Sequence, residues 1–211
     1  MPSSIDETKQ ILGKAEDILK TAEIGLEMLK SGNPNIMLPG LNNLVVFGRA
    51  ITNVLQQLRS SENEFDLWYT KYREEMKDDP LLKFFYKLRS EILKEGKVPV
   101  STSAYIESFY PDIDLRRIPK PPNAKAFFIG DRYGGSGWEV ELPDGTIQKY
   151  YVQLPKDIGV ISLLFKNPPN KHLGKNIKNK SPENLSELYI EYLRKMVKDA
   201  KKHFSPNKVN Y

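Results

Sequence analysis

Hydrophobic residues recur every three to four positions along the first 96 residues, the spacing that gathers them on one face of an α-helix. A first helix is predicted from Ser4 until the turn-forming sequence SGNPN, residues 31–35, stops it. Further helices are predicted over about 41–60 and 62–77, and from Pro80 to near residue 96. Apolar faces of this kind are stable only when buried against each other. The pattern therefore predicts an up-down bundle of four helices.

The fourth predicted helix has the clearest boundaries, because Asp79 can cap it and Pro80 suits its first position. The aromatic residues of the third and fourth helices fall within the apolar faces. We therefore expect Trp68, Phe84 and Phe85 to lie inside the shared core.

The pattern changes after the bundle. Residues 98–123 contain five prolines and little periodicity, which indicates an irregular crossing segment. Strand patterns follow over 125–131 and 138–154, and in the second of these Asp144 and Gly145 predict a hairpin turn. The apolar run at 159–165 fits either a fourth strand or a short helix.

A last helix is strongly marked near the C-terminal end. Ser181 is its predicted cap and Pro182 its first residue, and its apolar stripe is long and aromatic. Because such a stripe would form a large exposed patch, the helix should dock on the body of the protein. The predicted fold class is α+β, with a helical bundle over 1–97, a crossing segment over 98–123, and a small antiparallel sheet with the amphipathic helix over 124–211.

Composition excludes several kinds of chemistry. The chain of 211 residues has no cysteine, so disulfides, thiolate metal sites and cysteine nucleophiles are ruled out, which fits a reducing cytoplasm. No stretch approaches the roughly 20 apolar residues of a membrane span, so no membrane partner is expected. His172 and His203 have no acidic residues at metal-ligand spacing, and we expect no metal and no cofactor. The glycine-rich loop at 131–139 precedes a strand pattern and is interpreted as a hairpin loop, not a phosphate loop.

Positive charge is concentrated at the C-terminal end. Residues 171–211 contain ten Lys and Arg against four Asp and Glu, whereas the rest of the chain has 22 against 23. Such a segment favours phosphates or acidic surfaces, although a solvated helix face explains it equally well. The candidate phosphate-binding residues in this region are Lys171, Lys175, Lys178, Lys180, Lys198 and Lys202.

Two arginines stand in apolar surroundings on the predicted bundle, Arg49 in VVFGRAITNVL and Arg89 in FFYKLRSEIL. A guanidinium in such a place needs a partner, because burying an unpaired charge is costly. Each arginine either pairs with a carboxylate, such as those of Glu74, Glu75 or Glu91, lies on an exposed face, or meets a phosphate in a groove.

The helical pattern and the sequence DPLLKFFYKLRSEILKEG together resemble the HEPN superfamily of prokaryotic helical domains. The resemblance places Arg89 at the arginine of the family's ribonuclease motif, Ser90 at its polar position and Lys94 where a histidine would stand. It implies a homodimer, RNA as a ligand, and a setting in prokaryotic defence or toxin–antitoxin systems. A lysine of ordinary pKa is protonated at neutral pH and is a poor general base, so the site would bind and not cut.

Three functions remain open at this stage. The first is a non-catalytic HEPN-like module for binding or assembly, with RNA or a nucleotide as its ligand. The second is a metal-independent ribonuclease that uses a degenerate Arg89 and Lys94 site. The third is a module that binds a protein partner and has no role with nucleic acid.

Overall fold

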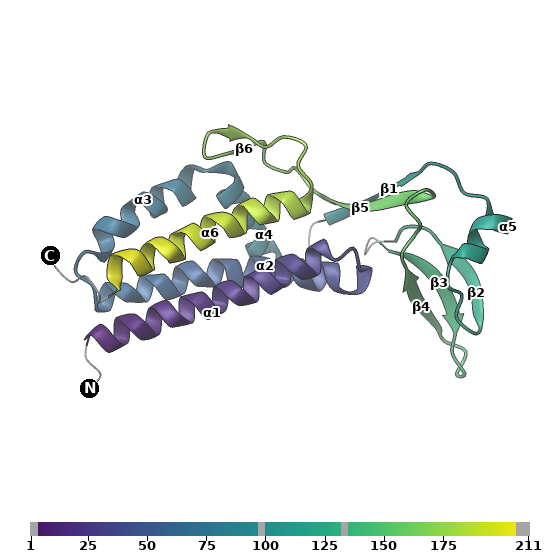
Figure 1. The fold of residues 1–211 in the computed structure, drawn as a ribbon, viewed down its shortest axis with the longest axis horizontal. Coiled ribbons are helices and arrows are strands. Elements are labelled where there is room, and N and C mark those ends of the chain that lie inside the picture. Colours follow the sequence, from purple (N-terminus) through teal and green to yellow (C-terminus); the bar gives the residue numbers. More distant parts are fainter. Residues whose placement is uncertain (1–3, 97–99, 132–134, 206–211) are drawn as a thin grey trace.

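The computed structural model describes residues 4–96, 100–131 and 135–205, and it has the predicted α+β class. A helical bundle forms one end of an elongated molecule, and a smaller β head, formed by residues 100–165, projects from the other end (Figure 1). The chain leaves the bundle after its fourth helix, builds the head, and returns to the bundle as its last helix.

The four N-terminal helices are confirmed, and no strand interrupts the described part of this region. They are α1 (Ser4–Lys30), α2 (Pro34–Leu55), α3 (Phe65–Asp78) and α4 (Pro80–Glu95), with a short 3-10 helix, η1 (Gln56–Ser60), after α2. Helix α2 begins earlier than predicted, because the Asn33 side chain caps it by accepting a hydrogen bond from the Asn35 amide at 3.0 Å. The turn sequence that stops α1 therefore also starts α2.

The core of the bundle agrees with the prediction for Phe85, which is buried and stacks on Tyr189 with ring centroids 4.2 Å apart. Trp68 and Phe84 were predicted to be inside but are only partly buried, at the edge of this core. Trp68 packs edge-on against Phe204, and Phe84 packs against Phe165, with centroid separations of 5.2 and 5.0 Å. Both rings thus join the bundle to segments from the C-terminal part of the chain.

The C-terminal helix α6 (Pro182–Phe204) begins as predicted, with the Ser181 hydroxyl accepting a hydrogen bond from the Asn184 amide. It docks on the bundle as expected, since its buried face belongs to the same hydrophobic cluster as α1–α4. The bundle therefore contains a fifth long helix that comes from a distant part of the sequence.

The segment predicted to be irregular instead contains a strand, β1 (Val100–Ile106), followed by α5 (Pro111–Asp114) and η2 (Leu115–Arg117). Strand β1 pairs antiparallel with β5 (Gly159–Phe165), which decides the open choice at 159–165 in favour of a strand. Because β1 finds its partner about sixty residues away and most of its residues are exposed, its short pattern was not recognisable locally.

The predicted hairpin is confirmed as β3 (Ser136–Glu141) and β4 (Ile147–Val152), and β2 (Ala124–Phe128) pairs with the other edge of β3. Gly145 has φ +82° in the turn, and its amide donates to the Leu142 carbonyl at 2.9 Å. The antiparallel pairing of β2 with β3 agrees with the hairpin interpretation of the glycine-rich sequence between them, of which residues 132–134 lie outside the described part of the chain. A second, small cluster of buried residues, Ile118, Leu154 and Ile158, stabilises the head.

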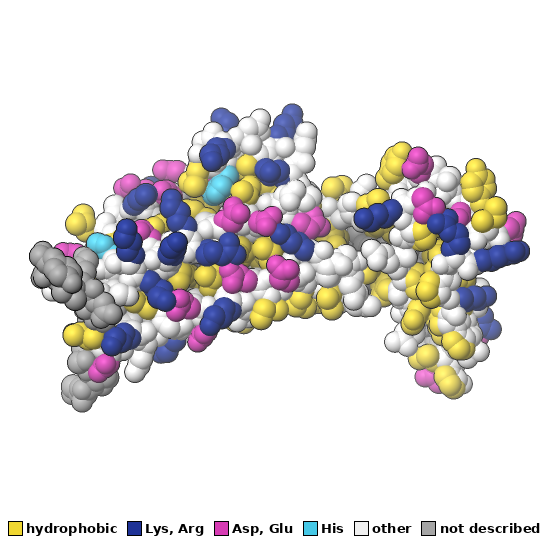
Figure 2. Space-filling model, in the orientation of Figure 1, with side chains coloured by type: hydrophobic (Ala, Val, Ile, Leu, Met, Phe, Trp, Pro, Cys, Tyr) yellow, Lys and Arg dark blue, Asp and Glu magenta, His cyan; other side chains and the backbone are white. Residues whose placement is uncertain are grey.

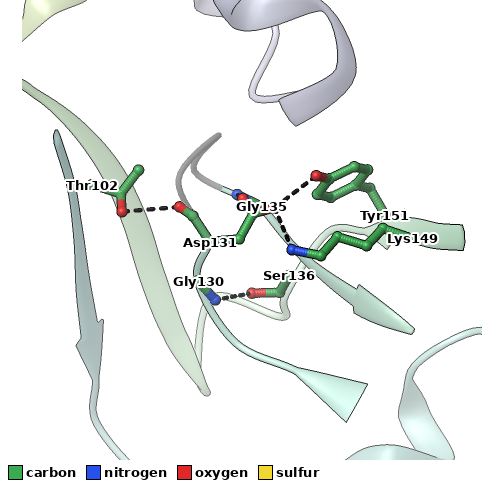
Figure 3. Close-up of polar contacts among 7 residues, drawn as sticks. All are labelled: Thr102, Gly130, Asp131, Gly135, Ser136, Lys149 and Tyr151. Carbon is green, nitrogen blue, oxygen red and sulfur yellow. Dashed lines mark hydrogen bonds and ion pairs between the residues drawn. The ribbon is translucent and has the colours of Figure 1, made fainter. Parts of the chain in front are cut away.

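A polar network around Asp131 ties the sheet of the head to the β1–β5 ribbon (Figure 3). The Asp131 carboxylate accepts hydrogen bonds from Lys149 Nζ at 3.0 Å, the Tyr151 hydroxyl at 2.7 Å and the Gly135 amide at 3.1 Å. Its backbone carbonyl accepts from the Thr102 hydroxyl of β1 at 3.0 Å. These bonds give Asp131 and Gly135 a structural role where β2 and β3 meet.

A short hairpin, β6 (Lys171–His172) and β7 (Lys175–Asn176), lies on the bundle at the start of α4. Its anchor is the buried carboxylate of Asp79, which caps α4 through the Leu82 amide at 3.0 Å. The same carboxylate accepts from the Leu173 amide at 2.6 Å and lies 2.9 Å from His172 Nδ1. His172 therefore has a structural role in holding the hairpin.

Replacing Asp79 by alanine is expected to lower the free energy of unfolding by about 2 kcal/mol at neutral pH, because a helix cap and two buried partners are lost together. Burial alone would raise the pKa of Asp79, but hydrogen bonds from Leu173, His172 and Leu82 outweigh it and hold the pKa below its ordinary 3.8. The contribution is therefore present above 3.8 and is lost as the pH falls through the folded-state pKa. Denaturant unfolding of the wild type and of Asp79→Ala at pH 7 and pH 3 measures this difference in unfolding free energy.

The matched control for this prediction is Asp78→Ala, which removes an exposed carboxylate one residue earlier. It should leave the unfolding free energy nearly unchanged at both pH values. Equal effects of Asp78→Ala and Asp79→Ala at pH 7, or an effect of Asp79→Ala that grows in acid, would contradict the assigned role.

Among the helices in the described part of the chain, none is both long enough and apolar enough to cross a lipid bilayer.

Candidate anion-binding pocket

A cavity of about 470 Å³ lies between α2, α3, α4 and α6. This volume falls within the roughly 300–1,000 Å³ typical of small-ligand sites, and helix-bundle interiors are a common place for them. Its lining residues are Arg49 and Thr52 of α2, Gln56 at the start of η1, Tyr69, Arg73, Met76 and Lys77 of α3, Leu82, Lys83 and Tyr86 of α4, and Tyr189, Tyr192 and Leu193 of α6.

Four of these side chains are cations, namely Arg49, Arg73, Lys77 and Lys83, and no carboxylate is among the described residues that line the cavity. The spacing along the sequence explains why they converge. On α3, Tyr69, Arg73 and Lys77 follow at intervals of four residues, which places them on one face of the helix. The pocket therefore carries a concentrated positive charge that favours an anionic ligand.

Arg49 is the half-buried cation of the pocket. Its guanidinium donates a hydrogen bond to the Thr52 hydroxyl, which itself donates to the Arg49 carbonyl at 2.9 Å. The guanidinium also lies over the ring of Tyr86, 5.6 Å from its centroid. Within the described residues, no carboxylate forms an ion pair with it, so the carboxylate pairing considered from the sequence does not occur. Neutral groups thus orient the Arg49 side chain, and no carboxylate among the described residues neutralises its positive charge at the cavity.

The three buried tyrosines of the pocket, Tyr69, Tyr189 and Tyr192, are held neutral. Burial raises the pKa of Tyr69, and the nearby guanidinium of Arg49 only partly opposes this. Burial also raises the pKa of Tyr189 and Tyr192 well above the ordinary value, and the neighbouring Glu75 carboxylate adds to the effect on Tyr192. These phenols therefore act as hydrogen-bonding groups and flat surfaces, and not as charges, at neutral pH.

The absence of a side chain at Gly48 allows the residues at the floor of the pocket to pack closely against α2. A Cβ atom on this residue would lie 2.7 Å from Tyr189 Cε1 and 3.2 Å from Leu193 Cδ1. The absence of a side chain on α2 lets Tyr189 sit between α2 and Phe85 of α4.

The other candidate residues from the sequence lie elsewhere. Arg89 and Lys94 are on α4 but outside the pocket, and no contact joins them, as expected for residues about 140° apart around a helix. The Arg89 Nε atom is buried, and no hydrogen-bond partner for it is found in the described part of the protein. Of the candidate residues named from the sequence, only Arg49 therefore lines the cavity.

The six candidate lysines are all exposed, on two separate surfaces. Lys171, Lys175, Lys178 and Lys180 lie on the β6–β7 hairpin and the loop after it, while Lys198 and Lys202 lie on α6. Basic and acidic side chains alternate over this side of the bundle (Figure 2). Two other cations of α6, Arg194 and Lys201, form ion pairs with Glu23 and Glu16 of α1.

Sequence reasoning missed most of the pocket. Arg73, Lys77 and Lys83 were not singled out from the sequence, and Tyr69, Tyr189 and Tyr192 fell on the apolar faces of predicted helices. The available signal was a row of polar side chains at helical spacing beside an apolar stripe, formed by Arg49 and Thr52 on α2 and Gln56 directly after it. Many solvated helix faces have such rows, so only the arrangement of four helices distinguishes this one.

The described residues contain no group of three or more His, Cys, Asp or Glu side chains arranged to hold a metal ion.

Comparison with known proteins gives one match. The model of a family described as bacteriophage lambda protein ea47 matches residues 32–136, which include α2–α4, the first part of the β head, and all four cations of the pocket. No curated protein matches the chain, and no solved structure does.

The resemblance to the HEPN superfamily is therefore wrong. It depended on a four-helix pattern and one arginine, and such features recur in unrelated helical proteins. The homodimer and the defence setting that it implied lose their basis as well. Over residues 32–136 the chain is similar to the family of phage lambda protein ea47.

Proposed function

We propose that this protein is a binding module for a small phosphate-bearing ligand, held between α2, α3, α4 and α6. The observation that carries the proposal is the convergence of Arg49, Arg73, Lys77 and Lys83 on one cavity whose described lining has no carboxylate. Arginine forks and lysine ammonium groups are the side chains that bind phosphate oxygens best. The buried, neutral floor strengthens this attraction, because charges interact more strongly away from bulk water.

Inorganic pyrophosphate is the simplest probe of this pocket. The most informative variant is Lys83→Ala, because Lys83 is exposed at the pocket and has no ion-pair partner among the described residues. Calorimetric titration should show binding to the wild type and binding about tenfold weaker to Lys83→Ala, the loss of one charge-assisted contact. Binding should also weaken as salt is raised.

The matched control is Lys87→Ala, one turn further along α4. Lys87 is equally charged and exposed, but it does not line the cavity and pairs with Glu91. Equal affinity of the two variants, or no binding of pyrophosphate to the wild type, would contradict the proposal.

RNA is a second candidate ligand, supported by the exposed lysines of the β6–β7 region, which have no ion-pair partners within the described chain. The same titration tests it with single-stranded RNA. Salt-sensitive RNA binding that survives Lys83→Ala and falls when Lys175 and Lys178 are neutralised would place the ligand on the hairpin and not in the pocket.

A further inference from the structure

Resting on the proposed function, we infer that the pocket takes a nucleoside phosphate, with the base inserted between the helices and the phosphate at the rim. The inference comes from three properties of the cavity: a gradient of burial, the hydrogen-bonding groups on its floor, and its size.

The residues that line the cavity lie at different depths. Arg73, Lys77 and Lys83 are exposed, and Tyr86 at the same level is 58% exposed. Leu82, Tyr69 and the three α6 residues are all buried. A ligand that matches both the exposed cations and the buried lining residues has an anionic end facing solvent and a largely apolar end inside.

The inner end must also form hydrogen bonds. Tyr69 Oη accepts a hydrogen bond from Gln56 Nε2 at 3.2 Å, so the phenol hydrogen remains available to an acceptor in the cavity. The Tyr189 hydroxyl reaches the same cavity from α6. A hydrocarbon tail would leave these buried groups unpaired at a cost in free energy, whereas a base has ring nitrogens and carbonyl oxygens that accept.

Flat surfaces are present at both levels. Tyr189 is immobilised by its stack on Phe85 and by the close approach of Gly48, and Tyr86 is covered by the Arg49 guanidinium. Tyrosine rings and an arginine plane are the groups on which bases stack in proteins. The floor thus offers stacking and hydrogen bonding together, which selects a planar heteroaromatic group.

The size of the cavity favours one nucleotide. Helices contribute lining residues from four sides, and the volume of about 470 Å³ is that of a small-molecule site. An internal segment of a polymer would need an entrance and an exit for its backbone. A free nucleotide, with its single phosphate end at the cationic rim, needs only one opening.

A ligand series tests the inference directly in the wild-type protein. Adenosine 5′-monophosphate should bind at least about tenfold more tightly than ribose 5-phosphate, because only the former has a base to stack and to hydrogen-bond. Inorganic pyrophosphate should bind through the rim alone. If no phosphate compound binds, the proposed function itself fails. If pyrophosphate binds and the two ribose compounds bind equally, only the inserted base is overturned.

Tyr69→Phe tests the orientation, since it removes one buried hydroxyl and keeps the ring. It should weaken the binding of adenosine 5′-monophosphate about fivefold or more and leave the binding of ribose 5-phosphate and pyrophosphate unchanged, while loss of the hydrogen bond from Gln56 lowers the melting temperature by about 2–4 °C. Tyr110→Phe, which changes an exposed tyrosine of the β head, is the control and should affect none of the three. An equal loss of affinity for all three ligands would mean that the Tyr69 hydroxyl acts by positioning Arg49. The inference that a base inserts between the helices would then be wrong.

Discussion

A chain that ends at Lys180, and therefore lacks α6, is expected to lose its cooperative unfolding transition. Helix α6 buries its apolar face along the bundle, and Tyr189, Met196 and Ala200 are almost inaccessible to solvent. Its removal would expose the facing residues of α1, α2 and α4 as one continuous apolar surface. The product should keep much of its far-ultraviolet helical signal, lose its near-ultraviolet signal and bind hydrophobic dyes, as a molten globule does.

The control for this truncation is Lys195→Ala in the full chain, which changes an exposed residue of α6 and should leave the melting curve unaltered. A truncated protein that melts cooperatively at the temperature of the full chain would show that α1–α4 form a complete core without α6.

The second large effect is expected at the contact between α1 and α2. A Cβ atom on Gly25 would lie 2.6 Å from the Leu44 backbone nitrogen, and one on Gly40 would lie 2.7 Å from the Gly25 carbonyl oxygen. Backbone cannot move aside as the end of a side chain can, so either alanine must push the two helices apart. Each substitution should lower the free energy of unfolding by about 3 kcal/mol, the upper end of overpacking costs, and the melting temperature by about 6–12 °C.

Gly13→Ala is the matched control, because Gly13 lies on the same helix α1 and a Cβ there would meet nothing within 4 Å. It should raise the free energy of unfolding by about 0.5–1 kcal/mol through the better helix propensity of alanine. The double variant of Gly25 and Gly40 should cost little more than the worse single one, since one separation of the helices accommodates both. Stability gains for Gly25→Ala or Gly40→Ala would contradict the close contact.

These glycines show what local sequence information leaves out. Gly13 and Gly25 stand in the same predicted helix and Gly40 directly precedes the next one, and nothing in their neighbours along the chain separates the tolerant glycine from the other two. The difference lies in which helix approaches which, a property of packing. The same holds for Arg49 and Arg89, two arginines in apolar surroundings of which only the first lines the cavity.

The sequence by itself determined the elements whose signals are local. Helical periodicity, the caps at Asp79 and Ser181, and the turn at Asp144 and Gly145 each depend on residues within one or two turns of chain, and each was correctly predicted. Only the tertiary structure decided the pairing of β1 with β5, the placement of α6 as a fifth bundle helix, and the pocket built from four helices. Those features join segments up to 185 residues apart, and their free energy comes from contacts that exist only once the segments have met.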